Sequence, residues 1–378
     1  MIEVIDLTGM SPGDWDALAV RSPRGEALQS HAWGEVKAAG GWRPLRVRID
    51  RDGSPVAVCS IQERDLSASV TRRAPGGLHR RLGGLGRFLY APFGPVLLRE
   101  DAGGALTGLR QIARRRHAAL LVVDPAWEEG SDPALALADG GFVRAERAVQ
   151  VATTGMYVTL HPDDEAQWRE LNQNVRRNIE RCRKAEVEVV RLDAASAEDD
   201  LDAALATAYR MLVETGERRG FAQDLRPADY HASSQRALIA AGHASLWMAR
   251  HDDRDLAYTL VHHSGDRAVL FEAGEAEQPA DGDPPTAQRF SANFLLQWTI
   301  IRWAAEQGFA TYDLSGVDNH SSPGLPSDES HPLWNLYRFK SQWGARPVQF
   351  AGAWEHAPWP LLGRTFRAIR SRGGSSRP

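Results

Sequence analysis

The chain of 378 residues has little cysteine and no long apolar segment. Its two cysteines, Cys59 and Cys182, are too few for a disulfide framework or a cysteine-based zinc site, which is typical of a reducing compartment. The first residues, MIEVIDLTGM, lack the basic and apolar regions of a signal peptide, and no apolar run reaches the ~18 residues that a membrane span requires. We therefore expect a cytoplasmic protein that does not cross the membrane, and peripheral contact with the inner membrane surface stays open.

An excess of charge of one sign is also missing. The sequence holds 45 basic and 49 acidic residues, a formal net charge of −4, which excludes a general cationic coat for nucleic acid but permits a local basic groove. The arginine- and glycine-rich segment 72–87 is predicted to be a loop, either solvated or in contact with phosphates or anionic lipids. Its glycines do not lie between the end of a strand and the start of a helix, so we exclude a nucleotide-binding loop there.

Several catalytic signatures are absent as well. The sequence has no Gly-x-Ser-x-Gly motif, which counts against the nucleophile of an α/β-hydrolase. His117 and the pair His262–His263 have no cysteine or carboxylate at the spacing of metal ligands. We therefore predict no metal site and no cofactor. The sequence also offers no obvious nucleophile and base that would act as a catalytic pair.

The local patterns that are present predict alternating helices and strands. Ser11 and Ser30 are expected to cap two short helices, and segments 42–50 and 55–63 alternate apolar and polar residues around a turn at Asp52–Gly53, which is typical of an antiparallel hairpin. Further on we predict one polar helix over about 164–184 and another over about 199–219, which ends before Gly220. The length predicts two domains.

One arrangement of elements occurs twice. Residues 88–98 have a strand pattern, a basic helix follows over about 104–117, and a buried strand then ends at Asp124. In the second half, a strand over 267–276 precedes a helix over about 293–307 and a strand that ends at Asp313. This repetition suggests a tandem duplication of one α/β domain.

The order of seven segments resembles the FemABX family, the aminoacyl-tRNA-dependent transferases that build peptidoglycan cross-bridges. The segments are QSHAWGEVK (29–37), YAPFGPV (90–96), VVDP (122–125), NVRRNIERCRKAEVEV (174–189), ETGERRGF (214–221), NFLLQWTIIRWAAEQGFATYDLSGV (293–317) and LYRFKSQWGARPVQFAG (336–352). Each one alone is a weak match, whereas seven in the same order over positions 29–352 are specific.

The resemblance implies a fold and a division of the chain. It implies an α/β protein with mixed sheets, built from two tandem GNAT-like domains with an interdomain cleft. The chain has no sustained heptad pattern, so the coiled-coil arm of some members is not expected. Residues 1–152 together with 345–378 would form an acceptor-binding domain, because the C-terminal segment returns to it in this family. Residues 153–344 would form the donor-side domain, and the protein would be a monomer.

Two basic residues are implied to bind the acceptor. Lys37 and Arg218 match the positions at which the family contacts the diphosphate of the substrate, and a lysine and an arginine are chemically suited to that task. The alternatives are a solvated Lys37 near a helix end and an Arg218 that favours the helix C-terminus electrostatically. Arg219 is expected to be the solvated neighbour of Arg218.

The remaining candidates lie at a strand end and in the segment FKSQWG. Asp124 could bind the acceptor amine or act as its general base, or it could accept backbone hydrogen bonds in a turn. The resemblance implies that Lys340 stabilises the oxyanion of the attacked ester and that Phe339 stacks on the RNA 3′ end, whereas the alternative is an exposed strand lysine beside a core phenylalanine. Tyr90 is a candidate substrate contact, and the alternative is a structural role.

The predicted function is therefore transfer of an amino acid from aminoacyl-tRNA, as co-substrate, to an amine of a peptidoglycan precursor with a diphosphate. Three alternatives remain: a secondary-metabolite acceptor with the same donor, an acyl-CoA-dependent GNAT N-acyltransferase, and a non-catalytic tRNA-binding module. The acyl-CoA alternative needs a pyrophosphate loop of the type Q/R-x-x-G-x-G/A between strand and helix. The segments around 103–104 and 288–289 do not fit that pattern.

Overall fold

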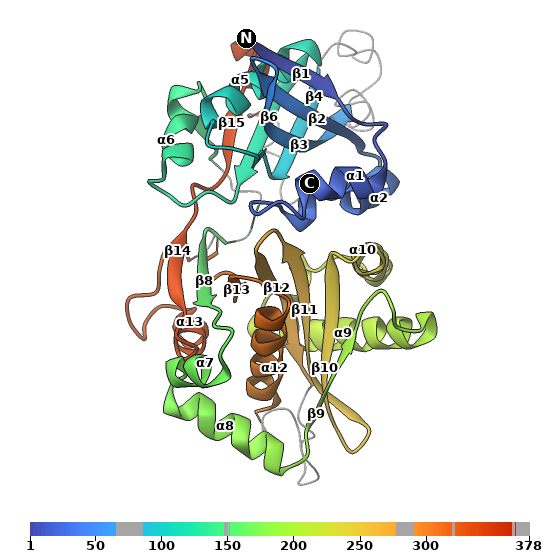
Figure 1. The fold of residues 1–378 in the computed structure, drawn as a ribbon, viewed down its shortest axis with the longest axis vertical. Coiled ribbons are helices and arrows are strands. Elements are labelled where there is room, and N and C mark those ends of the chain that lie inside the picture. Colours follow the sequence, from blue (N-terminus) through green and yellow to red (C-terminus); the bar gives the residue numbers. More distant parts are fainter. Residues whose placement is uncertain are drawn as a thin grey trace. The chain divides into compact units, whose positions relative to one another are not determined.

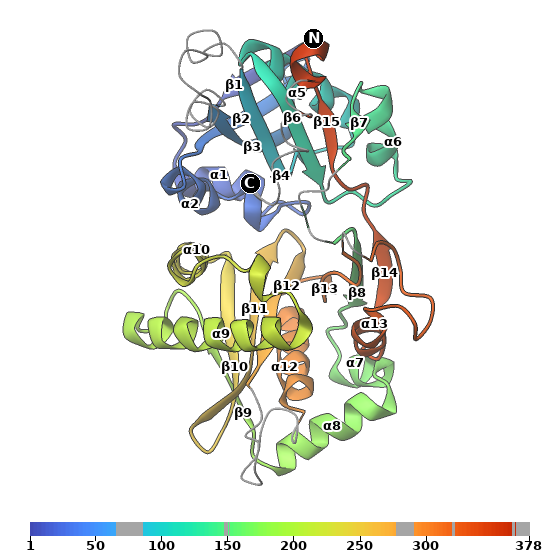
Figure 2. The same ribbon diagram turned by 180° about the vertical axis from the view of Figure 1, so that it is seen from behind.

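The computed structural model describes residues 1–65, 86–146, 150, 152–276, 291–319, 322–364 and 367 (Figures 1 and 2). Most of the arginine-rich segment 72–87 lies outside the described residues. The chain divides into two compact units, one formed by residues 1–153 with 349–378 and the other by residues 154–348. Each unit is built on its own mixed sheet.

The first unit contains a sheet whose strands follow the order β1-β2-β3-β4-β6-β15-β7, with β5 paired to β3. Its elements are β1 (Ile2–Asp6), α1 (Pro12–Ala19), α2 (His31–Ala39), β2 (Arg43–Arg51), β3 (Ser54–Asp65), β4 (Arg87–Phe93), β5 (Val96–Leu97), α5 (Ala102–Arg115), β6 (Ala118–Pro125), α6 (Asp132–Asp139), β7 (Val143–Arg144) and β15 (Trp354–His356).

Local sequence signals account for much of this unit. The predicted hairpin is confirmed as β2–β3, and its turn residues Asp52 and Gly53 both have positive φ, as a two-residue hairpin turn requires. The predicted caps are also confirmed, because the hydroxyl of Ser11 accepts from the backbone N–H of Asp14 and that of Ser30 from Trp33.

The two faces of the first sheet differ in chemistry. One face is apolar and packs against α5, and it includes Leu45, Val47, Ile61, Leu89 and Leu121. The opposite face carries a row of buried polar side chains. The strand register pairs Arg46 with Ser60, Gln62 with Tyr90, and Pro92 with Asp124, so the polar members share this face. The polar face is where the candidate residues of this unit gather.

The second unit contains a sheet in the order β14-β8-β13-β12-β11-β10-β9. Helix α12 packs on one face and α9 with α10 on the other, as the two opposite views show (Figures 1 and 2). The elements are β8 (Thr154–Thr159), α7 (Asp164–Glu170), α8 (Gln173–Lys184), β9 (Glu188–Leu192), α9 (Glu198–Arg219), α10 (Ala228–Ala240), β10 (Ala244–His251), β11 (Arg254–Ser264), β12 (Arg267–Glu275), α12 (Ala292–Glu306), β13 (Thr311–Asp313), α13 (Trp334–Ser341) and β14 (Arg346–Gln349).

The predicted strand–helix–strand repeat is confirmed in both units. In the first unit β4 and β6 are parallel neighbours connected through α5, and in the second β12 and β13 are parallel neighbours connected through α12. Asp124 lies near the end of β6 and Asp313 is the last residue of β13. Each repeat therefore delivers a carboxylate to the end of a buried parallel strand.

Two expectations about element boundaries need correction. The single polar helix predicted over 164–184 is two helices, because Leu171 is extended and buried and Asn172 caps α8. The backbone N–H of Asn172 donates to the carbonyl of Gln342, a distant contact that stabilises the break. The segment 345–348 belongs to the second unit, where β14 pairs with β8, and β15 is the strand that joins the first sheet.

Candidate functional site

Lys340 is a buried residue on helix α13. Its side chain is 6% exposed, and its ammonium nitrogen Nζ donates to the carbonyl of Gly316 at 2.7 Å. The alternative of an exposed strand lysine is therefore excluded. Burial lowers the pKa of Lys340 to about 7, the charge of Asp313 opposes that shift, and the charge of Arg219 adds to it. A lysine in this state is poised to gain or lose a proton near neutral pH.

Asp313 supplies the opposite charge at the end of β13. Burial raises the pKa of its carboxyl group, whereas the charges of Arg267 and Lys340 and the backbone N–H of Ser315 favour the carboxylate. Its Oδ1 atom accepts from the N–H of Ser315 at 2.7 Å, as expected for a turn-forming aspartate. The sequence placed Asp313 at a strand end, but it did not indicate the charge interaction with Lys340.

Phe339, the neighbour of Lys340, packs into the core of the second unit. Its ring lies edge-on to Phe294, with a centroid separation of 5.4 Å, and is 6.2 Å from the ring of Trp343. Trp343 is fully buried. Phe339 is half-buried in this aromatic group, so the side chain stabilises the position of α13. Its predicted stacking on RNA stays a prediction.

The two arginines at the end of α9 differ in their surroundings. The guanidinium group of Arg218 donates to the carbonyl of Glu275 at 3.0 Å and to the hydroxyl of Thr215 at 3.2 Å. Arg219 is exposed, and its charge acts on Lys340. The sequence prediction treated Arg219 as a solvated neighbour. The structure adds that this residue contributes to the electrostatic field at the buried lysine.

Asp124 and Tyr90 meet on the polar face of the first sheet. The Tyr90 hydroxyl donates to Oδ2 of Asp124 at 3.2 Å, and the side-chain amide of Gln150 donates to the same hydroxyl at 3.0 Å. Burial raises the pKa of Asp124 to about 6, although the hydrogen bonds from Tyr90 and from the backbone N–H of Gln150 oppose the shift. A carboxyl group of this kind can bind an ammonium group and exchange a proton near neutral pH.

Lys37 lies between two indole rings in the same unit. Its nitrogen Nζ is 5.4 Å from the ring centroid of Trp33 and 5.7 Å from that of Trp42, and the side chain is 9% exposed. The guanidinium group of Arg64 is 5.2 Å from the Trp42 ring centroid. Both cations contact the same aromatic ring, and lysine and arginine side chains are suited to bind an anion such as phosphate. Arg64 was not identified from the sequence.

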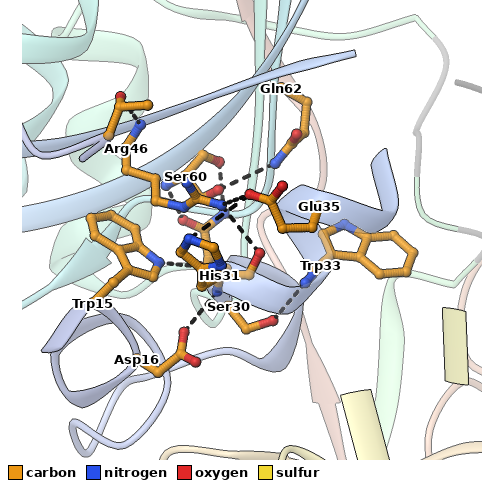
Figure 3. Close-up of polar contacts among 11 residues, drawn as sticks. Trp15, Asp16, Ser30, His31, Trp33, Glu35, Arg46, Ser60 and Gln62 are labelled. Atoms are coloured by element: carbon orange, nitrogen blue, oxygen red, sulfur yellow. Dashed lines mark hydrogen bonds and ion pairs between the residues drawn. The ribbon is translucent and has the colours of Figure 1, made fainter. Parts of the chain in front are cut away.

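A polar network beneath α2 holds this helix against the sheet (Figure 3). The buried guanidinium group of Arg46 donates to Glu35 at 2.8 Å and to the carbonyl of His31 at 3.1 Å. A Cβ atom at position 34 would lie 2.7 Å from Nη2 of Arg46 and 3.2 Å from Cβ of Pro44, so a larger residue here would displace the Arg46 guanidinium group. Because Lys37 is one turn further along α2, this network helps to orient it.

Gln62 is a further candidate that sequence reasoning missed. It is fully buried, pairs with Tyr90 in the strand register, and its amide nitrogen donates to Ser60 at 3.2 Å (Figure 3). Within the part of the chain that the structure describes, its carbonyl oxygen Oε1 has no hydrogen-bond partner. The sequence signal for Gln62 was a polar residue inside a buried strand. Ser60 and Asp124 show the same signal.

The structure thus groups the predicted residues within each unit. Asp124 and Tyr90 are in contact in the first unit, where Lys37 packs on Trp42, a member of the same cluster as Tyr90. Lys340 and Phe339 are neighbours in the second unit. Among the residues that the structure describes, no group of three or more His, Cys, Asp and Glu side chains could hold a metal ion. None of the described helices combines the length and the apolar character that a membrane crossing needs.

Comparison with known proteins supports the same fold in both units. A family model described as "Acetyltransferase (GNAT) domain" matches residues 169–321. A lipid II:glycine glycyltransferase of Staphylococcus aureus is 22% identical, with 94% of each chain covered. The crystal structure of FemX superposes with a TM-score of 0.73 at 18% identity and covers 97% of this chain and 99% of its own. A protein of unknown function from Bacteroides thetaiotaomicron has a TM-score of 0.56 at 11% identity, over 94% of this chain and 99% of its own.

The fold and the two groups of residues define a tandem GNAT-like α/β protein. The similarity to the lipid II:glycine glycyltransferase extends over nearly the whole chain, and the architecture is that of FemX. No coiled-coil arm is present among the described residues.

Proposed function

We propose that this protein transfers an aminoacyl group from aminoacyl-tRNA to an amino group of a peptidoglycan precursor. The observation that carries the proposal is the buried Lys340, which lies in the second GNAT-like domain beside Asp313. Similarity over 94% of the length of a lipid II:glycine glycyltransferase supports a precursor of the cell wall as the acceptor. Use of aminoacyl-tRNA as donor is supported by the seven segments that resemble the FemABX family.

In the proposed reaction the acceptor amine attacks the ester carbonyl carbon of the donor. The new C–N bond forms, the ester C–O bond breaks, the amine loses a proton, and the terminal hydroxyl of the tRNA leaves with a proton. Negative charge develops on the carbonyl oxygen during the attack. The ammonium group of Lys340 stabilises that charge more in the transition state than in the ground state.

We propose that residues of the first unit and Arg218 on α9 bind the acceptor. Asp124, whose pKa is about 6, is mostly a carboxylate at pH 7 and can bind the ammonium form of the acceptor or take its proton. Tyr90 holds Asp124 through its hydroxyl. We propose Lys37 as one contact to the acceptor phosphates, since it lies with Arg64 around Trp42, and Arg218 as another.

The acceptor can be nucleotide-linked or lipid-linked, because both forms carry a peptide amine and a diphosphate. A lipid-linked acceptor would bring the protein to the inner face of the cytoplasmic membrane. We propose this location on the basis of the acceptor named for the Staphylococcus aureus relative. The experiment therefore has to offer both acceptor forms.

A transfer assay tests the proposal directly. The protein is incubated with a pool of charged tRNAs or with acetyl-CoA, each with UDP-MurNAc-pentapeptide or lipid II, and the acceptor is analysed by mass spectrometry. We expect a mass increase of one amino-acid residue that requires charged tRNA and disappears after deacylation of the tRNA. Lys340→Met should slow its formation by roughly 10²–10³-fold, whereas the exposed control Lys184→Met should leave the rate unchanged.

Other outcomes assign the alternatives. An acetylated product with acetyl-CoA alone would favour an N-acyltransferase, in agreement with the description of the matched domain model. Aminoacylation of a small amine without any product on either cell-wall precursor would favour a secondary-metabolite acceptor. Binding of tRNA without transfer to any amine would contradict an enzymatic role.

A further inference from the structure

The loop that follows β13 carries the carbonyl group that Lys340 binds. The N–H of Leu314 donates to the carbonyl of Met156 at 2.8 Å, and that of Val317 donates to Thr154 at 3.0 Å, so both ends of the loop are bound to β8. Between them, Ser315 has a φ of +65°, which is costly for a residue other than glycine. The Oδ1 atom of Asp313 accepts the N–H of Ser315 and stabilises this conformation.

This conformation determines where the carbonyl of Gly316 points. Gly316 directly follows Ser315, and its oxygen is 2.7 Å from Nζ of Lys340. A change in the backbone of Ser315 would therefore displace the acceptor of the lysine. Asp313 thus acts on Lys340 in two ways, through the backbone of this loop and through its own charge.

The charged groups around the pair come from several elements. Asp313 on β13 favours the ammonium form of Lys340, and Arg219 at the end of α9 opposes it. Arg267 on β12 and Lys340 favour the carboxylate form of Asp313. Tyr157 on β8 pairs with Asp313 in the strand register and accepts a hydrogen bond from Arg267, and Arg346 on β14 lies over the Tyr157 ring.

We propose that Asp313 is a positioning residue that holds Lys340 as an ammonium ion and fixes the Gly316 carbonyl to which this ion is bound. The inference rests on the proposed function, in which Lys340 stabilises the transition state. Without Asp313, less negative charge would offset the effects of burial and of the positive charge of Arg219 on Lys340. It would then lose its proton at a lower pH and lose its role in catalysis over the neutral range.

The small number of lysines makes a direct test possible. The sequence contains three, Lys37, Lys184 and Lys340, so uniform incorporation of ¹³C-lysine gives few Cε signals. Lys340→Met assigns one of them, and the exposed Lys184 serves as an internal control. The full chain is titrated by NMR, with wild type, Asp313→Asn and Asp313→Glu compared. Asparagine can still accept the Ser315 N–H but carries no charge.

We expect the Lys340 signal of the wild type to titrate near pH 7 and that of Asp313→Asn to titrate about one to three pH units lower. Asp313→Glu should stay closer to the wild type because it keeps the charge. The Lys184 signal should not move in any variant. In the transfer assay, the decline of kcat with rising pH should shift to lower pH by the same amount as the NMR midpoint.

The results separate the inference from the proposed function. If the NMR midpoint shifts but no substrate is used, the role of Asp313 in holding the ammonium form stands and the proposed function fails. An unchanged Lys340 midpoint in a folded Asp313→Asn protein overturns the inference whatever the activity. Should Asp313→Asn not fold, the smaller neutral variant Asp313→Ser replaces it. If neither neutral variant folds, Asp313 is a structural residue and the inference is wrong.

Discussion

The two units share a strand–helix–strand repeat, yet they surround the acidic strand end with different partners. Asp124 receives hydrogen bonds from the hydroxyl of Tyr90 and the backbone of Gln150, and burial raises its pKa to about 6. Asp313 interacts with Arg267 and Lys340, two cations that oppose the effect of burial. The repeat therefore determines where the carboxylate lies. Residues on the other elements around it determine its chemistry.

The comparison suggests a division of labour. A carboxyl group held by neutral donors, as in the first unit, keeps its charge available for a cationic ligand such as an amine. A carboxylate that already faces a lysine, as in the second unit, instead maintains the charge of that lysine. We expect the first arrangement to serve the acceptor and the second to serve the ester carbonyl. The following predictions test this difference.

The largest effect is expected for Lys340→Met. Loss of the ammonium group should lower kcat by roughly 10²–10³-fold, the range found when one donor to an oxyanion is removed. The melting temperature should change little, because methionine fills a similar volume and removes the cost of burying a charge. Rates under saturating charged tRNA, with Lys184→Met as the control, check this. A parental kcat in Lys340→Met would show that the charge of this lysine is not used in the reaction.

The next prediction concerns the pH dependence of stability in the first unit. The pKa of Asp124 is about 6 in the folded protein against an ordinary value of 3.8, so the folded state holds the proton more tightly. The resulting stabilisation is complete below pH 3.8 and is lost as the pH rises through 6, by about 3 kcal/mol in total. Urea unfolding of wild type and Asp124→Asn across this range should show the loss in the wild type alone. Parallel curves for the two proteins would contradict the raised pKa.

A smaller effect is expected at the proposed phosphate contacts. Lys37→Met and Arg218→Met should each raise the acceptor KM by about ten- to a hundredfold, equivalent to the ~1.5–3 kcal/mol of a charge-assisted hydrogen bond. The KM for charged tRNA should stay within about twofold. Steady-state kinetics with each substrate varied in turn check this. An equal rise in both KM values would indicate a general structural defect instead of a lost acceptor contact.

The sequence predicted those features that depend on neighbouring residues. The β2–β3 hairpin, the caps at Ser11 and Ser30 and the two strand-end aspartates follow from local patterns, and the structure contains them. The break between α7 and α8 could not be predicted, because neither Leu171 nor its neighbours include a glycine or proline. The break depends on Gln342, whose carbonyl and side chain bind the start of α8.

The candidate site shows the same limit. Asp124 and Lys340 were found through their motifs, but the burial of Lys340 and its interaction with Asp313 depend on how α13 packs beside β13. Arg64 was missed because only the fold brings it next to Trp42. Gln62 had a local signal, a polar residue inside a buried strand, but its pairing with Tyr90 depends on β4, which is distant in the sequence. Contacts between residues far apart in the sequence have no signal in local periodicity.

The smallest expected effect comes from Tyr90→Phe, which removes one hydroxyl and leaves the ring in place. The Tyr90 hydroxyl stabilises the carboxylate form of Asp124, so its loss should raise the pKa of Asp124 further above 6. In Tyr90→Phe, the stabilisation from the protonated form of Asp124 should therefore be lost at a higher pH than in the wild type. Stability at pH 7 should fall by about 1 kcal/mol, the net contribution of one hydrogen bond.

The Gln150 amide also loses its acceptor in Tyr90→Phe. Urea unfolding of Tyr90→Phe in the Asp124→Asn background separates the two contributions, because the upward shift requires a titrating Asp124. A shift that persists in the double variant would show that Tyr90 does not act through Asp124, and the contrast between the two strand ends would then lose its basis in the first unit.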